Sequence, residues 1–276
     1  MNKNPSDDLA GRKPPVEDAA PVSPAGSGLE AELQALRQRN EALETELAAL
    51  RRQQDMLAYG LSHDLRGPMR AIDGFAQQLD RRCRELLPET DAGRQHLERI
   101  RGAVSRMGGL VDSLVEYSQV GRGQPRFAEV DMSFLADWTL MDLRDTHPGL
   151  DVQAEVDPGL RVAGDERLLK SLLGKLADNS RKFLDPIRGL RLKLKGAVEA
   201  GQVHLQWIDE GIGMALRDPQ QPFEPFVRLH TASQGAGDGL GLAIAQAITQ
   251  RHGGRIWAES AEGAGTTMHL LLPRAA

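Results

Sequence analysis

The first long pattern in the chain is a leucine at every seventh position. These leucines are Leu29, Leu36, Leu43, Leu50 and Leu57. The positions four residues further on are Leu33, Asn40, Leu47, Gln54 and Leu61. Leucine at the d positions, with one Asn among the a positions, is typical of a parallel two-stranded coiled coil. The pattern predicts such a coiled coil over residues 29–60. The alternative is a single amphipathic helix packed on its own domain.

The helical pattern continues past His63 to about Leu87. Pro68 lies inside it, and we expect this proline to kink the helix and open a backbone hydrogen bond just after His63. Residues 86–91 predict a turn and a new helix start. A second helix follows, with apolar residues on helical spacing at Leu97, Ile100, Val104, Met107, Leu110, Val111, Leu114 and Val115. Two such helices per chain, doubled by the coiled coil, predict a dimeric four-helix bundle over residues 61–123.

Beyond a Gly- and Pro-containing linker at residues 121–125, the pattern becomes mixed α/β. Strands are predicted around residues 151–156, 188–196, 203–209, 254–260 and 266–272. Helices are predicted over residues 132–146, 165–183 and 241–251. Helices grouped against a mostly antiparallel sheet predict an α/β sandwich over residues 124–276.

Composition excludes several classes of protein. The 276 residues carry a formal net charge of −5, and no Lys/Arg cluster is dense enough for a nucleic-acid interface. Cys83 is the only cysteine, so no internal disulfide can form and a reducing compartment is expected. No apolar run approaches the ~20 residues that span a bilayer, so we expect no membrane insertion and a cytoplasmic location. Residues 1–28 are poor in large apolar groups and are expected to form a disordered tail.

The most informative chemistry in the first half is His63 beside Asp64. A neutral imidazole is a nucleophile at physiological pH, and its second nitrogen needs an orienting partner. Asp64 is the adjacent carboxylate that could orient the ring and accept its proton. Most histidines have only a packing or surface role, so the pair alone is weak evidence for a catalytic site. The segments that follow it strengthen this interpretation.

Three later segments have the chemistry of a nucleotide site. A helix ends with Asn179, Lys182 and Phe183, which offer a metal ligand, a cation for phosphate and a ring for a base. An apolar strand leads into a turn at residues 209–214, in which the Asp209 carboxylate can accept a hydrogen bond from an exocyclic amine. A glycine-rich segment then opens a helix and offers backbone N–H groups to phosphate. Its residues are Gly237, Gly239, Leu240 and Gly241. Each segment alone also fits an ordinary helix, turn or linker.

The order of these segments resembles that of the sensor histidine kinases of two-component systems, from about Leu57 to Pro273. Residues 61–72 look like the H box of that family, and their sequence is most similar to that of its bacteriophytochrome-like branch. The resemblance makes His63 the phosphoacceptor and Asp64 the acid that assists it.

The same resemblance assigns the later segments to the family's nucleotide boxes. Asn179 corresponds to the Mg²⁺-binding Asn of the N box, with Lys182 and Phe183 at matching positions. Asp209, Gly211 and Gly213 match the G1 box, whose Asp recognises adenine. Phe223 and Phe226 match the F box, Arg228 is similar to a basic residue after it, and the glycine-rich segment matches the G2 box. The resemblance implies ATP and Mg²⁺ as cofactors, and an aspartate on a response-regulator receiver domain as phosphoryl acceptor.

The chain departs from this family at five positions. Lys175 replaces an additional Asn, Ser180 replaces an Ala, Glu210 replaces an Asn and Asp238 replaces a Ser or Thr. Extra acids near a triphosphate weaken its binding unless a cation compensates, and Lys175 is a candidate for that cation. Gly67 stands where Thr or Asn positions water in members that also dephosphorylate their partner, so phosphatase activity by that route is not expected. A simple relief of crowding before Pro68 also accounts for this glycine.

Two other functions fit these departures. One is a dimeric histidine phosphotransfer protein with a degenerate ATP domain, and the other is a scaffold that sequesters a regulator. Binding of Mg²⁺·ATP separates the kinase from the relay, and phosphohistidine separates both from the scaffold. The input signal, the identity of the regulator and the choice between cis and trans phosphorylation are not encoded in any recognisable motif.

Overall fold

A computed structural model describes residues 24–86, 92–199, 201–229 and 237–275. Within α1 (Pro24–Leu86) some side chains, including that of His63, lie outside the described residues. The chain divides into two compact units, Met1–Arg52 and Gln53–Ala276. Across the described ranges, no helix combines the length and the apolar character that a bilayer span requires.

In the first unit, α1 is helical from Pro24 onward, and residues 32–46 are all exposed in the single chain. Leu33, Leu36 and Leu43 are among the exposed large apolar side chains. Of the disordered tail predicted over residues 1–28, residues 1–23 lie outside the described residues, and residues 24–28 are helical, so the predicted boundary is too late by five residues. The side chains of Leu47 and Leu50 also lie outside the described residues. The coiled coil therefore stays a prediction, and the continuous helix it requires is present.

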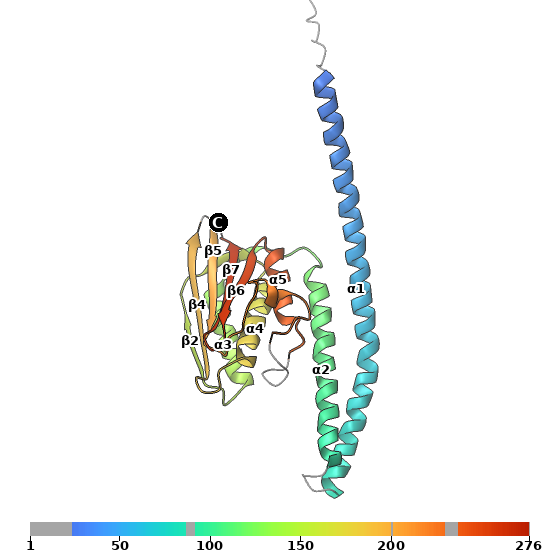
Figure 1. Ribbon diagram of the computed structural model, residues 1–276, viewed down its shortest axis with the longest axis vertical. Helices are drawn as coiled ribbons and strands as arrows, with labels where there is room; N and C mark the ends of the chain where they lie inside the picture. The colour runs from blue at the N-terminus through green and yellow to red at the C-terminus, as the bar shows by residue number, and fades with distance from the viewer. Residues whose placement is uncertain (1–23, 87–91, 200, 230–236, 276) are drawn as a thin grey trace, which may run out of the picture. The chain divides into compact units, whose positions relative to one another are not determined.

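In the second unit, α1 and α2 (Ala92–Val120) form the predicted helical hairpin (Figure 1). The helix α1 continues through Pro68 without interruption. Met69, Val104 and Val111 are buried between the two helices, with Leu65 packed against them. The turn predicted at residues 86–91 lies outside the described residues from 87 onward.

The described residues from 124 onward fold as the predicted α/β sandwich. The five-stranded sheet has the order β2 (Val152–Val156), β4 (Leu190–Glu199), β5 (Gln202–Asp209), β7 (Gly265–Pro273) and β6 (Arg255–Ala261). Only the β2–β4 pair is parallel. The helices α3 (Met132–Thr146), α4 (Glu166–Lys182) and α5 (Gly241–Arg251) cover one face of the sheet (Figure 1). Burial alternates along β5, so Val203, Leu205 and Trp207 are buried against the helices.

Sequence patterns did not predict a small second sheet. It pairs β1 (Ala128–Asp131) with β3 (Arg161–Gly164) in antiparallel register, with Val130 opposite Val162. A short 3₁₀-helix, η1 (Gln221–Phe223), also went unpredicted. The small sheet precedes α4 along the chain, and η1 lies between β5 and α5. Neither changes the predicted architecture.

Candidate functional site

The helix α4 carries the first part of the site. Its N-cap is Asp165, whose carboxylate accepts the backbone N–H groups of Arg167 and Leu168 at 3.1 and 3.3 Å. Buried leucines fix the helix against the sheet at Leu169, Leu172, Leu173 and Leu176. The last turn then places Asn179 and Lys182 at the helix end, and Phe183 is the C-cap, with its N–H donated to the Asn179 carbonyl at 3.1 Å.

A pocket at this helix end joins the predicted N-box residues to the glycine-rich segment. Its lining includes the predicted site residues Asn179, Lys182, Phe183, Arg228, Gly237, Gly239 and Gly241. It also includes Met214 and Leu242, from the predicted turn and glycine-rich segments, and four residues that the sequence patterns did not place in a site: Asp178, Pro222, Val227 and Leu229. Lys175 and Asp238, noted only as departures from the family, line it as well. The pocket thus has cationic, amide and apolar groups together, as a nucleotide requires.

The glycine-rich segment leaves open backbone toward this pocket. A Cβ placed on Gly237 or Gly241 would meet no atom within 4 Å. Gly239 has a φ of +73°, and a Cβ there would lie 2.8 Å from the Phe226 backbone. Phe226 itself has a positive φ of 66°, and its N–H donates to the Gly239 carbonyl at 2.9 Å. The backbone at Gly239 and Phe226 is therefore held closely together, and Gly239 admits no side chain.

One of the backbone N–H groups predicted to bind phosphate already has a hydrogen-bond acceptor within the protein. The N–H of Leu240, the buried N-cap residue of α5, donates to the Asp238 carboxylate at 3.0 Å. Asp238 therefore brings a negative charge into the pocket and also holds a backbone donor that sequence reasoning assigned to phosphate.

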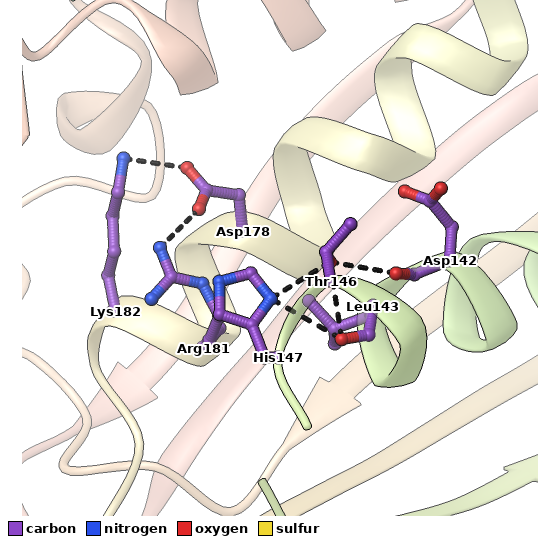
Figure 2. Close-up of polar contacts among 7 residues, drawn as sticks. All are labelled: Asp142, Leu143, Thr146, His147, Asp178, Arg181 and Lys182. Carbon is purple, nitrogen blue, oxygen red and sulfur yellow. Dashed lines mark hydrogen bonds and ion pairs between the residues drawn. The ribbon is translucent and has the colours of Figure 1, made fainter. Parts of the chain in front are cut away.

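Asp178 organises the cations at the end of α4 (Figure 2). Its carboxylate lies 2.6 Å from Lys182 Nζ and 2.7 Å from a guanidinium nitrogen of Arg181. Burial raises the pKa of Asp178, but hydrogen bonds and charge from Lys182 and Arg181 outweigh burial and hold the pKa below its usual range. The i,i+3 and i,i+4 spacing of these residues is the signal that could have found the cluster.

Asp209 lies at the buried end of β5 and is 6% exposed. One carboxylate oxygen accepts the Gly211 N–H at 3.0 Å, and the other accepts the Ser180 hydroxyl at 3.0 Å. Burial raises the pKa of Asp209, and the hydrogen bonds from Gly211, Ser180 and the Thr266 backbone oppose that rise without cancelling it. Asp209 does not itself line the pocket.

The turn after Asp209 is hydrogen-bonded to Phe183, a residue that lines the pocket. The Ile212 N–H donates to the Phe183 carbonyl at 2.9 Å, and a Cβ on Gly211 would collide with that same carbonyl. Gly213 has a φ of +64°, and a Cβ there would collide with the Ala261 carbonyl. Both G1 glycines are therefore required by close approach to other backbone segments of the protein, and their approach to a ligand stays a prediction.

Two of the departures from the family, Lys175 and Glu210, have contacts that limit their effect on a bound nucleotide. Lys175 Nζ lies 2.6 Å from a carboxylate oxygen of Glu116 on α2, so its charge is already paired although it lines the pocket. Glu210 lies 3.9 Å from Arg191 and is absent from the described lining of the pocket. Of the two departures that add an acid, Asp238 is thus the one that lines the pocket, and Lys175 is a weaker compensating cation than the sequence suggested.

The phosphoacceptor region is on α1. His63 belongs to this helix, and its side chain lies outside the described residues, so its pairing with Asp64 remains a prediction. Asp64 and Gly67 are exposed. Beyond its chain neighbours and the backbone of its own helix, a Cβ on Gly67 would meet no atom within 4 Å, so packing against other elements does not require a glycine here.

The donor set suits a nucleotide with a divalent cation better than a metal held by protein alone. In the described ranges, no group of three or more His, Cys, Asp or Glu side chains could hold a metal ion. Mg²⁺ is commonly bound through one or two protein oxygens and the phosphates of its substrate. The Asn179 amide at the pocket fits that smaller role.

Comparison with known families matches both parts of the chain. Residues 52–123 match the His Kinase A (phospho-acceptor) domain. Residues 164–276 match the histidine kinase-, DNA gyrase B- and HSP90-like ATPase family. The two matches follow one another in the order that the boxes predict.

Curated relatives agree with these matches. The phytochrome-like protein Cph1 of Synechocystis sp. is 30% identical over 216 residues, which cover 78% of this chain and 28% of Cph1. The sensor-like histidine kinase SenX3 of Mycobacterium tuberculosis is 28% identical over 219 residues, which cover 77% of this chain and 52% of SenX3. The chain thus spans between about a quarter and about half of the length of these relatives.

Solved structures show the same architecture. Full-length ShkA, in complex with AMPPNP, is 25% identical with a TM-score of 0.57, over 79% of this chain and 46% of ShkA. The histidine kinase ThkA, in complex with the response regulator protein TrrA, has 20% identity and a TM-score of 0.56, over 88% of this chain and 66% of ThkA. With its phosphoacceptor and ATPase domains in this order, the chain belongs to the histidine kinases.

Proposed function

We propose that the chain is an ATP-dependent protein-histidine kinase that phosphorylates its own His63 and passes the phosphoryl group to a response regulator. The observation that carries this proposal is the pocket in which Asn179, Lys182 and Phe183 meet the open backbone of Gly237 and Gly241. It lies in the ATPase domain that follows a phosphoacceptor domain in the same chain. We assign residues 29–60 to the coiled coil, 61–123 to the phosphotransfer hairpin and 124–276 to the catalytic domain.

The pocket supports a specific placement of ATP. The adenine would lie toward Asp209 and Phe183, and its amine would donate to the Asp209 carboxylate. The triphosphate would lie along the glycine-rich segment, with Lys182 and Arg228 as nearby cations. Lys182 would exchange its partner Asp178 for phosphate. Mg²⁺, held through the Asn179 amide and the phosphates, would supply charge neutralisation.

The transfer itself needs an in-line nucleophile. A ring nitrogen of His63 would form a bond to the γ-phosphorus while the bond from that phosphorus to the β–γ bridging oxygen breaks, and ADP leaves with the bond's electrons. The proton on the other ring nitrogen would pass to Asp64 or to water through Asp64. Positioning and charge stabilisation provide most of the acceleration in such reactions.

The acceptor of the phosphoryl group follows from the same phosphoacceptor domain. A phosphohistidine on an exposed helix can pass its phosphoryl group to an aspartate of a receiver domain, which restores His63. The ThkA structure contains a response regulator, which supports this class of partner for our chain. Since ATP and receiver domains are cytoplasmic, we place the reaction in the cytoplasm.

Labelled ATP tests this proposal directly. The wild-type protein with Mg²⁺ and γ-labelled ATP should acquire label that is lost in acid and stable in base. His63→Gln should abolish that label, because glutamine has no ring nitrogen to attack phosphorus. His96→Gln is the matched control, since His96 is an exposed histidine of the same hairpin, and it should label normally. Undiminished labelling of His63→Gln would sink the assignment.

Two further measurements separate the alternatives. A panel of receiver domains added to the labelled protein should remove label from His63 and acquire it on aspartate. Calorimetry with Mg²⁺·ATP should detect binding to the wild-type protein. Absence of ATP binding would favour the phosphotransfer relay, and absence of phosphohistidine from any donor would favour the scaffold.

A further inference from the structure

Ser180 lies between two groups that sequence reasoning never connected to it. Its hydroxyl oxygen is 3.1 Å from Trp207 Nε1 and 3.0 Å from the Asp209 carboxylate. The three residues are buried, with Ser180 and Trp207 each 1% exposed. Ser180 is also the residue directly after Asn179 on α4, so it connects the metal-ligand position of the site to its base-recognition position.

The direction of these hydrogen bonds is fixed by chemistry. An indole N–H can only donate, so the Ser180 oxygen must accept from Trp207. The single hydroxyl proton is then available for Asp209, whose ionised carboxylate can only accept. The chain of donors therefore runs from Trp207 through Ser180 to Asp209. A polarised hydroxyl of this kind is a stronger donor than an isolated one.

Asp209 has a second fixed contact on its other oxygen, the Gly211 N–H at 3.0 Å. With the Thr266 backbone hydrogen bond, these donors on the two oxygens fix the plane of the carboxylate as well as its position. Since burial works against ionisation of Asp209, each of these donors also helps to keep the group charged. Loss of either donor should therefore rotate the carboxylate, or protonate it, or both.

We propose that Ser180, held by Trp207, is a positioning residue that aims the Asp209 carboxylate at the amino group of an adenine base and thereby sets base selectivity. This inference rests on the proposed ATP site. It adds a residue that itself need not touch the nucleotide. A base with an oxo group in place of the amine would meet an acceptor facing an acceptor, and would bind less well.

The test compares three ligands and two matched variants by calorimetry. Ser180→Ala removes the hydroxyl, and Ser171→Ala removes a hydroxyl from the same helix that is bonded to Glu116. The ligands are the Mg²⁺ complexes of ATP, of inosine triphosphate, which lacks the amine, and of inorganic tripolyphosphate, which lacks the base. Wild type should bind ATP more tightly than inosine triphosphate. Ser180→Ala should weaken ATP binding roughly tenfold, the scale of one hydrogen bond to a charged group, with tripolyphosphate unchanged.

The pH profile gives a readout that a merely structural role would not move. Only the ionised Asp209 accepts from the amine, so ATP binding is lost as the pH falls through the pKa of Asp209. The hydrogen bond from Ser180 lowers the pKa of Asp209, so its removal should raise that pKa. The acid limb of ATP binding should thus move to higher pH in Ser180→Ala, and Ser171→Ala should keep the wild-type limb. Trp207→Phe, which leaves the hydroxyl without its donor, should shift the limb in the same direction.

Each outcome decides the matter. If wild type binds tripolyphosphate but does not distinguish ATP from inosine triphosphate, or binds no ATP, the base site and this inference both fail. If wild type prefers ATP and Ser180→Ala keeps the wild-type preference and pH limb, the inference alone fails. If Ser180→Ala loses tripolyphosphate as strongly as ATP, the residue is structural and the inference is likewise overturned.

Discussion

Asp238 combines two effects that oppose phosphate binding in one carboxylate. Its charge lies in the pocket lining, and it holds the Leu240 N–H at 3.0 Å. Asp238→Asn keeps an oxygen that can accept this N–H and removes the charge. Because two like charges about 4 Å apart in a water-like environment cost ~1 kcal/mol, ATP should bind about fivefold more tightly to this variant. Calorimetry at constant ionic strength measures the change.

Glu210→Gln provides the matched control for Asp238→Asn. It removes an equal charge from the same domain, at a residue that lies 3.9 Å from Arg191 and outside the described pocket lining. ATP affinity should stay within about twofold of wild type, since exposed charges at a distance are screened by solvent and salt. Equal effects of the two variants would show that net charge, and not the position of Asp238, governs binding.

The sequence indicated which residue types form the site, but it did not indicate how they connect. Asn179, Lys182 and the glycines could be predicted because their chemistry and spacing are local. The link from Ser180 to Asp209 could not, because it depends on which face of β5 packs against α4. Trp207 and Asp209 are two residues apart and share one face of the strand, so one serine of the helix reaches both.

The start of α4 depends on one carboxylate. Asp165 accepts backbone N–H groups from Arg126, Arg167 and Leu168 at 2.9 to 3.3 Å. Asp165→Ala removes all three acceptor contacts, and we expect the free energy of unfolding to fall by about 1–2 kcal/mol. Asp165→Asn is the matched control, because its amide oxygen can still accept, and it should lose less than half as much. Urea unfolding of both variants measures the difference.

The pH dependence of this cap has a definite sign. Burial raises the pKa of Asp165, but hydrogen bonds from Arg126, Leu168 and Arg167 outweigh burial and hold the pKa below its ordinary value. A lowered folded-state pKa gives stability that is present above the unfolded pKa of about 3.9 and lost as the pH falls through the folded pKa. The gap between wild type and Asp165→Ala should therefore narrow in acid. A gap that widens in acid would contradict the assignment.

At the scale of elements, the long sequence patterns predicted helices and strands that the structure contains, and the short patterns did not reveal β1 and β3. The strands of the main sheet and the helices α3, α4 and α5 match the predicted ranges to within a few residues, because each repeats its period several times. The strands β1 and β3 have four residues each, and only Val130 and Val162 of them are buried apolar side chains. One apolar residue has no period, so pairing between these segments comes from the tertiary fold.

At the scale of the molecule, the hairpin has more apolar surface than one chain can bury. Its helices bury one stripe against each other and expose a second one. The exposed side chains are Ile72, Phe75 and Leu79 of α1, with Ile100, Met107 and Leu110 of α2. Exposed apolar stripes along both helices are typical of an interface. They support the proposal that two copies join their hairpins in a four-helix bundle, as the leucine repeat predicts for residues 29–60.

Phe75→Asp tests the bundle. Phe75 is 66% exposed in the single chain, so the substitution should change the folding of the protomer little. In a symmetric dimer it would place two carboxylates among apolar side chains, and burying an unpaired charge is costly. Sedimentation equilibrium should therefore show the dissociation constant of the dimer raised by at least tenfold. Ile187→Asp, at a 95% exposed residue of the ATPase domain, is the matched control and should leave that constant unchanged. If Phe75→Asp also leaves it unchanged, the exposed stripe is not the dimer interface, and the leucine repeat alone would have to hold the two copies together.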